Sequence, residues 1–123
     1  VAEFLASHPK IAYVNYCGLP GDKYHAVAEK YLPNGSCGVV SFGVKGGREA
    51  AAAFMGHLKI AAIETHVADA RTCCLHPASS THRQMNDEQL IAAGVQPDLV
   101  RMSCGLEDKN DLIHDIAQAL DQI

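Results

Sequence analysis

Apolar residues along this 123-residue chain recur with two spacings, one typical of strands and one typical of helices. Short runs rich in β-branched, aromatic or small apolar residues predict strands at 11–16, 38–44, 60–67, 72–75 and 99–104. Segments with helical spacing lie around and between them, at 1–8, 24–32, 48–58, 86–93 and 108–120. In segment 24–32 the spacing places four apolar side chains inward, those of Ala26, Val27, Tyr31 and Leu32.

Residues with strong local preferences mark the ends of these segments. Pro9 ends the first helix, because proline cannot continue a helix and disfavours helical backbone in the residue before it. Asn86 and Gln89 have the spacing of a capping box, and Gly94 closes the helix that they begin. Asp108 caps the last helix. The apolar face of that helix comprises Leu112, Ile113, Ile116, Ala117 and Leu120.

The predicted order after the opening helix is β-α-β-α-β-β-α-β-α, without internal repeats. Several helices and short strands favour an α/β (α+β) fold, a two-layer sandwich with a mostly antiparallel sheet. The length and a hydrophobic content of 48% suit one domain spanning residues 1–123. The first residue is Val1, not Met, and it already lies in a helical pattern. We therefore expect this chain to be part of a longer polypeptide.

The charge and the cysteines narrow the choice of partners and compartment. A formal net charge of −4 with no basic stretch argues against binding to nucleic acid or to anionic membranes. No apolar run reaches membrane-spanning length, and the first residues do not resemble a signal peptide. The five cysteines favour reduced thiols in a cytoplasmic protein, because their number is odd and most lie in apolar runs. Cys73 and Cys74 would point to opposite faces of a strand, which disfavours a disulfide between them.

Arg101 is the residue that most needs an explanation, because it lies inside an apolar strand. A guanidinium is always charged and presents a planar fork of donors that fits a carboxylate. Without a partner, a buried arginine would cost several kcal/mol, roughly the cost of a broken charge pair. Two explanations stay open at this point: a structural acidic partner such as Glu107, or an anionic ligand.

The loop at 76–82, with the sequence HPASSTH, is the second region with possible chemistry. His76, His82, Cys73 and Cys74 lack the spacing of a zinc site, so we expect no metal there. A hydrolase with Ser79 or Ser80 beside His82 is weakly supported, because the Gly-x-Ser-x-Gly elbow is missing. We expect the histidines to satisfy backbone groups of the loop, and the hydroxyl residues to cap the turn. The Gly-Gly pair at 46–47 is expected to form a plain tight turn, because the glycine-rich nucleotide fingerprints are absent.

Five stretches together resemble the pyridoxal 5'-phosphate-dependent enzymes of Cys/Met metabolism. They are VAEFL (1–5), VNYCGLP (14–20), SFGVKGGRE (41–49), HPASSTH (76–82) and DLVRMSCGLE (98–107). The runs HVAD (66–69) and THRQ (81–84) are most similar to the O-acetylhomoserine sulfhydrylase branch. The resemblance covers nearly the whole chain. It implies the small C-terminal domain of the aspartate aminotransferase superfamily, with helices on one face of the sheet.

The resemblance also implies a cofactor and a reaction. The cofactor, pyridoxal 5'-phosphate, would be held by a large domain outside this chain, because none of the lysines here lies in a Ser-x-Thr-Lys type motif. The implied reaction is a γ-replacement, in which acetate leaves O-acetyl-L-homoserine and sulfide adds to give L-homocysteine, with the cofactor as electron sink. No catalytic or cofactor-binding residue would lie in this chain, and the chain alone is expected to be inactive.

Carried over residue by residue, the resemblance makes Arg101 the clamp for the substrate α-carboxylate. His66 lies where relatives have Asn or Ser beside that carboxylate, and Ser79, Ser80 and Thr81 match a loop edging the site. Lys45 and Arg48 are expected to be surface or helix-start residues. The complete enzyme would be a homo-oligomer, most simply a tetramer, that takes a small amino-acid substrate.

Other functions stay open on the sequence alone. Arg101 would serve equally in a methionine γ-lyase or in a cystathionine γ-synthase or lyase of the same family. A stand-alone domain that binds small carboxylates or partner chains without catalysis is an alternative of another class. A thiol-redox or metal role for the Cys73–Cys74 pair is a third.

Overall fold

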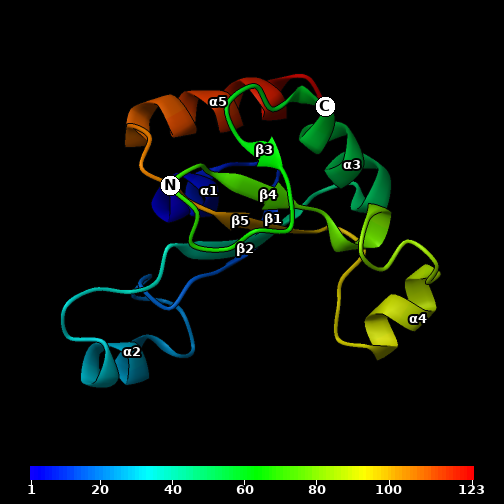
Figure 1. The fold of residues 1–123 in the computed structure, drawn as a ribbon. Helices are drawn as coiled ribbons and strands as arrows, with labels where there is room; N and C mark the ends of the chain where they lie inside the picture. The colour runs from blue at the N-terminus through cyan, green and yellow to red at the C-terminus, as the bar shows by residue number, and fades with distance from the viewer.

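The computed structural model describes residues 1–123, which form one five-stranded sheet with helices packed against it (Figure 1). The strand order across the sheet is β1-β2-β5-β4-β3. Every neighbouring pair is antiparallel except β3 and β4, so the predicted mostly antiparallel sheet is confirmed. The strands are β1 (Ile11–Asn15), β2 (Val39–Val44), β3 (Ala62–Ile63), β4 (Cys73–Leu75) and β5 (Leu99–Ser103).

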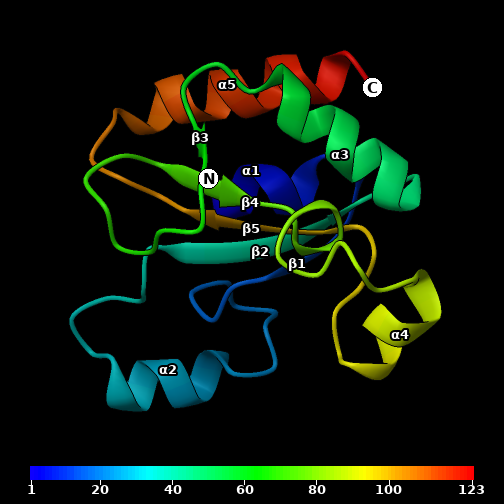
Figure 2. The ribbon, with the colours of Figure 1, turned by 45° about the vertical axis from the view of Figure 1, so that its right-hand side comes forward.

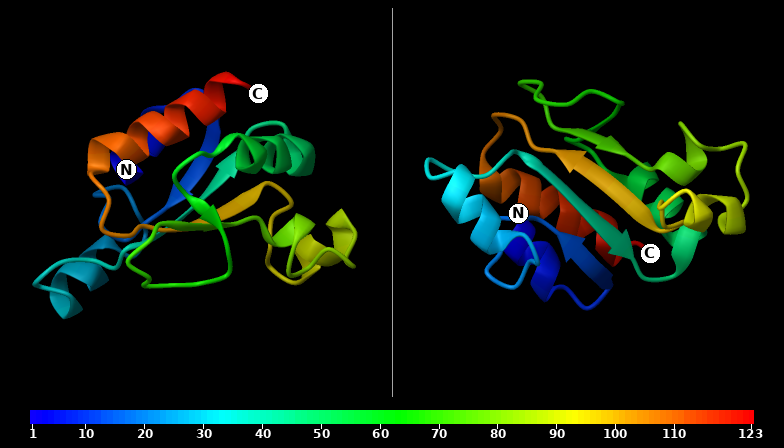
Figure 3. Two further views of the ribbon diagram at one scale, coloured as in Figure 1. Left: turned by 45° about the horizontal axis from the view of Figure 1, so that its top comes forward. Right: turned by 90° about the horizontal axis from the view of Figure 1, so that it is seen from below.

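Three of the helices, α1, α3 and α5, cover one face of the sheet (Figures 1 and 2). Seen from the opposite side, the strands are largely uncovered, with α2 and α4 set at the two ends (Figure 3). The predicted two-layer arrangement is therefore confirmed, and the uncovered side is called here the open face. The helical segments are α1 (Ala2–Ser7), α2 (His25–Tyr31), α3 (Gly47–His57), the 3₁₀ turn η1 (Pro77–Ser79), α4 (Asp87–Ala92) and α5 (Lys109–Asp121).

The core lies between the sheet and the layer of α1, α3 and α5. Phe42 on β2 and Phe54 on α3 are fully buried and meet edge to face, with ring centroids 5.8 Å apart. Ile116 and Leu120 on α5 are buried in the same cluster. Each of these large side chains contributes about 1.5–3 kcal/mol of burial free energy, so their packing holds the two layers together.

The predicted signals at the beginnings and ends of the helices are present in the structure. Asn86 accepts a hydrogen bond from the Gln89 N–H at 2.9 Å, and the Gln89 side chain accepts from the Asn86 N–H at 3.0 Å. Gly94 has a φ of +81°, which glycine adopts without strain. Asp108 accepts from the Asn110 N–H at 2.7 Å and begins α5.

Two sequence-based predictions about these elements are wrong. The apolar residues of α2 face solvent: Val27 is 53% exposed and Tyr31 is 68% exposed, while Ala28 is the buried residue. The reason is that α2 projects away from the sheet, so no layer covers its apolar side (Figure 2). The predicted strand at 60–67 is reduced to Ala62–Ile63, because β3 pairs only with the three-residue strand β4.

A buried carboxylate, Asp115 on α5, joins that helix to the chain between α3 and β3. Its oxygens accept from the backbone N–H groups of Lys59 at 2.8 Å, Ile60 at 2.9 Å and Ala61 at 3.1 Å. Without Asp115 these donors would lack an acceptor in the protein at a partly buried chain crossing, which is costly. The sequence prediction placed Ala117 on the apolar face and missed Asp115, because an aspartate in a helix normally faces water.

Pairing across the sheet sets which side chains reach the open face. Ser41, Arg101 and Leu75 lie opposite one another on β2, β5 and β4. Residues paired in this way point to the same side of a sheet. Their neighbours Phe42, Val100 and Cys74 point instead into the core and are fully buried. None of the helices combines the length and the apolar composition that crossing a membrane requires.

Candidate functional site

Arg101 lies at the middle of β5, half-buried, with only one hydrogen-bond partner. Its Nη2 donates to the backbone carbonyl oxygen of Thr65 at 2.8 Å. Its Nε is buried and has no partner. Arg101 takes part in none of the ion pairs in the chain. A guanidinium that is held in place but lacks a counter-charge is suited to receive an anion.

The structural partner proposed for Arg101, Glu107, is engaged elsewhere. Its carboxylate accepts from the Thr72 N–H at 2.8 Å and from the Thr72 hydroxyl at 2.7 Å. Burial acts to raise the pKa of Glu107, but these hydrogen bonds from Thr72 outweigh it and lower the pKa below its usual value. Glu107 is therefore not the structural partner of Arg101. Its carboxylate instead binds Thr72, the residue before β4.

A cavity of about 510 Å³ opens beside Arg101 on the open face. Arg101 is the only lysine or arginine in its lining, and Thr65 and Thr81 also border it. The remaining walls are mostly apolar or weakly polar. A pocket with apolar walls and one convergent charged group fits a small carboxylate-bearing ligand. The full lining is Val39, Ser41, Thr65, Leu75, Pro77, Thr81, His82, Leu99 and Arg101.

The loop at 76–82 is held together by its own side chains. His76 is buried; its Nε2 lies 2.8 Å from the Pro97 carbonyl oxygen and its Nδ1 lies 2.8 Å from the Ser79 hydroxyl. Because a carbonyl only accepts, Nε2 carries the hydrogen and Nδ1 accepts from Ser79. Burial lowers the pKa of His76 and keeps the ring neutral. The expectation that this histidine satisfies backbone groups of its own loop is wrong, because its ring bonds the Pro97 carbonyl, outside the loop, and the Ser79 hydroxyl.

The same contacts decide which hydroxyl groups are free to meet a ligand. The Ser80 hydroxyl donates to the His76 carbonyl oxygen at 2.6 Å, and Ser79 is used by the His76 ring. Thr81 and His82 contact each other, with Oγ1 and Nδ1 2.9 Å apart, and both line the cavity. The arrangement predicted for a hydrolase is not assembled, because neither serine is bonded to His82. Of the loop hydroxyl residues, only Thr81 lines the cavity beside Arg101.

His66, the other predicted substrate-binding residue, lies outside this lining. Its Nδ1 is 3.0 Å from a carboxylate oxygen of Glu64 and 3.5 Å from one of Asp69. The side chain is 62% exposed. Its backbone neighbour Thr65, which sequence reasoning did not single out, supplies the carbonyl that holds Arg101. A substrate-binding role for the His66 side chain stays a prediction.

Arg48, which was expected to be a surface or helix-start residue, lies at the start of α3 and also bonds to the loop that borders the cavity. Its Nε donates to Asp87 at 2.8 Å, its Nη2 donates to the Met85 carbonyl oxygen at 3.1 Å, and its Nη1 donates to the Ala78 carbonyl. One side chain on α3 thus fastens both ends of the loop that borders the cavity. A signal was present in the sequence, because a cation in the first turn of a helix opposes the helix dipole and calls for a partner.

We expect the substitution Arg48→Ala to loosen the 77–87 loop without unfolding the sheet. Three charge-assisted hydrogen bonds are lost, with a net cost of about 1.5–3 kcal/mol. Trypsin cleavage after the exposed Arg83 should then accelerate by roughly tenfold to a hundredfold, because local opening controls access. The control is Lys45→Ala, which removes a side-chain hydrogen bond to the Pro9 carbonyl and none to the 77–87 loop. Equal cleavage rates in the two variants would contradict this role.

Comparison with known proteins identifies the family. The model of the family described as Cys/Met metabolism PLP-dependent enzyme matches residues 1–121. The chain belongs to this family. Among its members, the chain is 45% identical over 124 residues to an O-acetyl-L-homoserine sulfhydrylase of Leptospira meyeri and 44% identical over 121 residues to a homocysteine synthase of Schizosaccharomyces pombe. It is also 40% identical over 123 residues to an L-methionine gamma-lyase of Fusobacterium nucleatum.

A solved member of the family confirms the fold. A chain from Campylobacter jejuni, described as an O-acetylhomoserine (thiol)-lyase, superposes with a TM-score of 0.87 at 37% identity over 98% of the present chain. The present chain spans 28% of that chain's length, 28% of the length of the Leptospira and Schizosaccharomyces relatives, and 31% of the Fusobacterium relative. The Campylobacter structure carries a pyridoxyl-lysine monophosphate.

The family depends on pyridoxal phosphate. No lysine lines the cavity beside Arg101. Lys10 donates to the carbonyl oxygens of Leu120 and Ile123, and Lys45 donates to that of Pro9. Lys23 and Lys30 lie over tyrosine rings on or beside α2. In the Campylobacter structure the cofactor is joined to a lysine. The cavity described here does not supply such a lysine.

Proposed function

We propose that this chain is the C-terminal domain of a longer pyridoxal phosphate-dependent enzyme and that it binds the α-carboxylate of the substrate. The observation that carries the proposal is Arg101, a positioned guanidinium with an unpartnered Nε beside an open cavity. The family match over residues 1–121 and the fractional coverage of the relatives support it. Such a domain would supply substrate orientation, while the cofactor chemistry belongs to residues outside this chain.

The chain's own residues would act by holding and orienting the substrate. Arg101 would grip the carboxylate with two parallel N–H donors, a geometry that fixes both position and rotation. The Thr65 carbonyl sets the angle of the guanidinium, and Thr81 borders the bound molecule from the loop. The bound cofactor would supply the electron sink for bond cleavage. Fixing the substrate by its carboxylate accelerates the reaction, because the entropy cost of orienting the reacting groups is met when the substrate binds.

For the reaction, we propose γ-replacement on O-acetyl-L-homoserine with sulfide, giving L-homocysteine and acetate. The relatives with 43–45% identity are named O-acetyl-L-homoserine sulfhydrylase or homocysteine synthase, which favours this substrate. The L-methionine gamma-lyase at 40% identity favours methionine γ-elimination as the second candidate. Both reactions begin with an amino acid whose carboxylate Arg101 would hold, so the arginine alone does not separate them.

We also propose that the complete enzyme is a cytoplasmic homo-oligomer, most simply a tetramer. The exposed apolar residues of α2 support an interface, because Tyr24, Val27 and Tyr31 are each more than half exposed on one short helix. The free, partly buried cysteines agree with a reducing compartment. The oligomeric state is accessible to light scattering on the purified protein.

The test of the proposed reaction is an assay on the protein in its full natural length, loaded with pyridoxal phosphate. We expect L-homocysteine and acetate to form from O-acetyl-L-homoserine and sulfide, with little methanethiol from L-methionine. Preferred release of methanethiol and 2-oxobutanoate from methionine would replace the first candidate by the second. Binding of small carboxylates without turnover of either substrate would support the stand-alone binding domain instead.

A control distinguishes the chain's contribution from that of the rest of the enzyme. The 123-residue chain alone, incubated with pyridoxal phosphate and reduced with borohydride, should show no specific adduct, since none of its lysines lines the Arg101 cavity. A single stoichiometric adduct on one lysine would contradict the proposed division of labour between this chain and the rest of the enzyme.

A further inference from the structure

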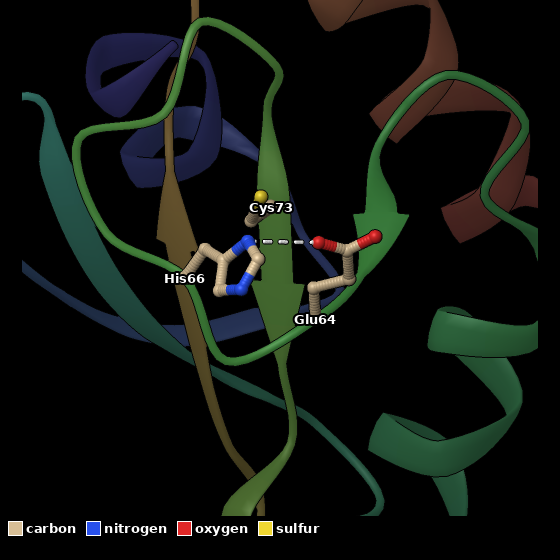
Figure 4. A group of neighbouring side chains, drawn as sticks. All are labelled: Glu64, His66 and Cys73. Carbon is tan, nitrogen blue, oxygen red and sulfur yellow. Dashed lines mark ion pairs between the residues drawn. The ribbon is translucent and has the colours of Figure 1, made fainter.

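Three metal-binding side chains, Glu64, His66 and Cys73, meet on the open face beside β4, outside the lining of the Arg101 cavity (Figure 4). One carboxylate oxygen, one imidazole nitrogen and the thiol sulfur all lie within 4.8 Å of one another. Two of the three already touch, since His66 Nδ1 and a Glu64 oxygen are 3.0 Å apart. Cys73 is buried, while the other two are exposed to solvent, so an ion could reach the group from outside.

The backbone around this group is held in place before any ion arrives. Glu64 directly follows β3, and its N–H donates to the Cys74 carbonyl oxygen at 3.1 Å, which continues the β3–β4 pairing. The turn after His66 is fixed by Ala68, which has a φ of +59° and donates its N–H to the Ser103 hydroxyl at 2.9 Å. A non-glycine residue with positive φ is uncommon and needs such support. The ligand residues lie on the segment at 64–68 and on strand β4. Hydrogen bonds therefore fix that segment to the sheet.

The local charge favours a cation. The carboxylates of Glu64 and Asp69 flank the same His66 nitrogen, at 3.0 and 3.5 Å. The two carboxylates beside the imidazole therefore give this group a negative potential that attracts a cation.

We propose that Cys73 Sγ, His66 Nδ1 and a Glu64 oxygen bind a divalent transition-metal ion of the zinc class. A mixed sulfur, nitrogen and oxygen donor set suits zinc better than magnesium or calcium, which take oxygen ligands. Metal–ligand bonds of about 2.0–2.3 Å place tetrahedral donors roughly 3.3–3.7 Å apart, so the side chains need only small movements. The Cys73 thiol proton leaves to solvent on binding, and Asp69 or water takes the fourth position.

Metal binding at this group also has a consequence for Arg101. Thr65 lies between the ligands Glu64 and His66 in the chain, and its carbonyl oxygen accepts the one hydrogen bond that Arg101 makes within the protein. An ion that joins Glu64 and His66 to β4 would fix Thr65 in the position that orients the guanidinium.

The experiment is a cobalt(II) titration of the protein in its full natural length, after treatment with chelator and reductant. Tetrahedral cobalt gives intense visible d–d bands, and a thiolate ligand adds a charge-transfer band in the near ultraviolet. We expect both at one equivalent, and we expect zinc to displace them. The substitution Cys73→Ser should abolish the charge-transfer band, and His66→Gln should weaken binding by roughly tenfold to a hundredfold, as should Glu64→Gln.

Matched controls come from other parts of the chain. Cys37→Ser removes an exposed thiol, and His25→Gln removes the histidine of another histidine–glutamate pair. Both should leave the titration unchanged. The proposal is overturned if no stoichiometric cobalt site forms, if the charge-transfer band survives Cys73→Ser, or if a control variant removes it. Because His66 is exposed, His66→Gln tests the site even where Cys73→Ser fails to fold.

Discussion

The substitution Arg101→Ala is expected to lower kcat/KM for the amino-acid substrate by roughly 10²–10³-fold in the complete enzyme, corresponding to about 3–4 kcal/mol. The reason is the position of the guanidinium: it has one hydrogen bond to the Thr65 carbonyl, a buried Nε without a partner, and no part in any ion pair. Removing it takes away the only arginine or lysine in the cavity. The measurement is steady-state kinetics with O-acetyl-L-homoserine and sulfide.

Two comparisons separate a carboxylate clamp from a purely structural arginine. Arg101→Lys keeps the charge but not the planar fork, so it should recover only part of the loss. Arg83→Ala removes an exposed arginine from the neighbouring loop and should leave the kinetics unchanged. Cofactor absorbance should persist in every variant, because no residue of this cavity is a lysine. Unchanged kinetics in Arg101→Ala would remove Arg101 from the site.

The second large effect is on stability, for the substitution Asp115→Ala in α5. Three backbone N–H groups, those of Lys59, Ile60 and Ala61, lose their acceptor at a partly buried chain crossing. Hydrogen bonds to a charged acceptor are worth about 1.5–3 kcal/mol each, and partial access of water returns some of that. We expect a net loss of about 3 kcal/mol in the free energy of unfolding of this region.

Hydrogen exchange resolved to single amides is the direct measurement. The amides of residues 59–61 should exchange roughly a hundredfold faster in Asp115→Ala, because about 3 kcal/mol of local stability is lost. The amides in the centre of β2 should change less. Asp121→Ala is the matched control, since this aspartate lies on the same helix and is exposed. Protection at 59–61 that matched the unsubstituted protein would show that Asp115 is dispensable there.

The sequence predicted most of the elements because the signals that end them act over a few residues. The capping box at Asn86 and Gln89, the left-handed Gly94 and the cap at Asp108 all operate within one helical turn. The element order followed from these boundaries and from the hydrophobic spacing. Prediction failed where a segment's surroundings mattered more than its spacing: in α2 the apolar pattern is present, but the helix lies away from the sheet and its apolar side is exposed.

The candidate site was predicted in part. Arg101 stood out from the sequence because a charged residue in a strand demands a partner. The partner itself was wrong, since Glu107 is bonded to Thr72, 35 positions away in the chain. Arg48 was expected to be a surface or helix-start residue; it does begin α3, but its bonds to the loop at 77–87 were not predicted. The grouping of Glu64, His66 and Cys73 was not foreseen, because the spacing of these residues matches no metal-binding motif.

By itself, the sequence determined the fold class, the order of most elements, the family resemblance and the anomaly at Arg101. Each of these depends on residue type and on spacing within a short segment. Only the tertiary structure decided which distant groups meet: Arg101 with Thr65, Glu107 with Thr72, and Asp115 with residues 59–61. The physical reason is that strand order and register place these partners together. The energy of a hydrogen bond or ion pair depends on angstrom-scale separations that spacing along the chain does not encode.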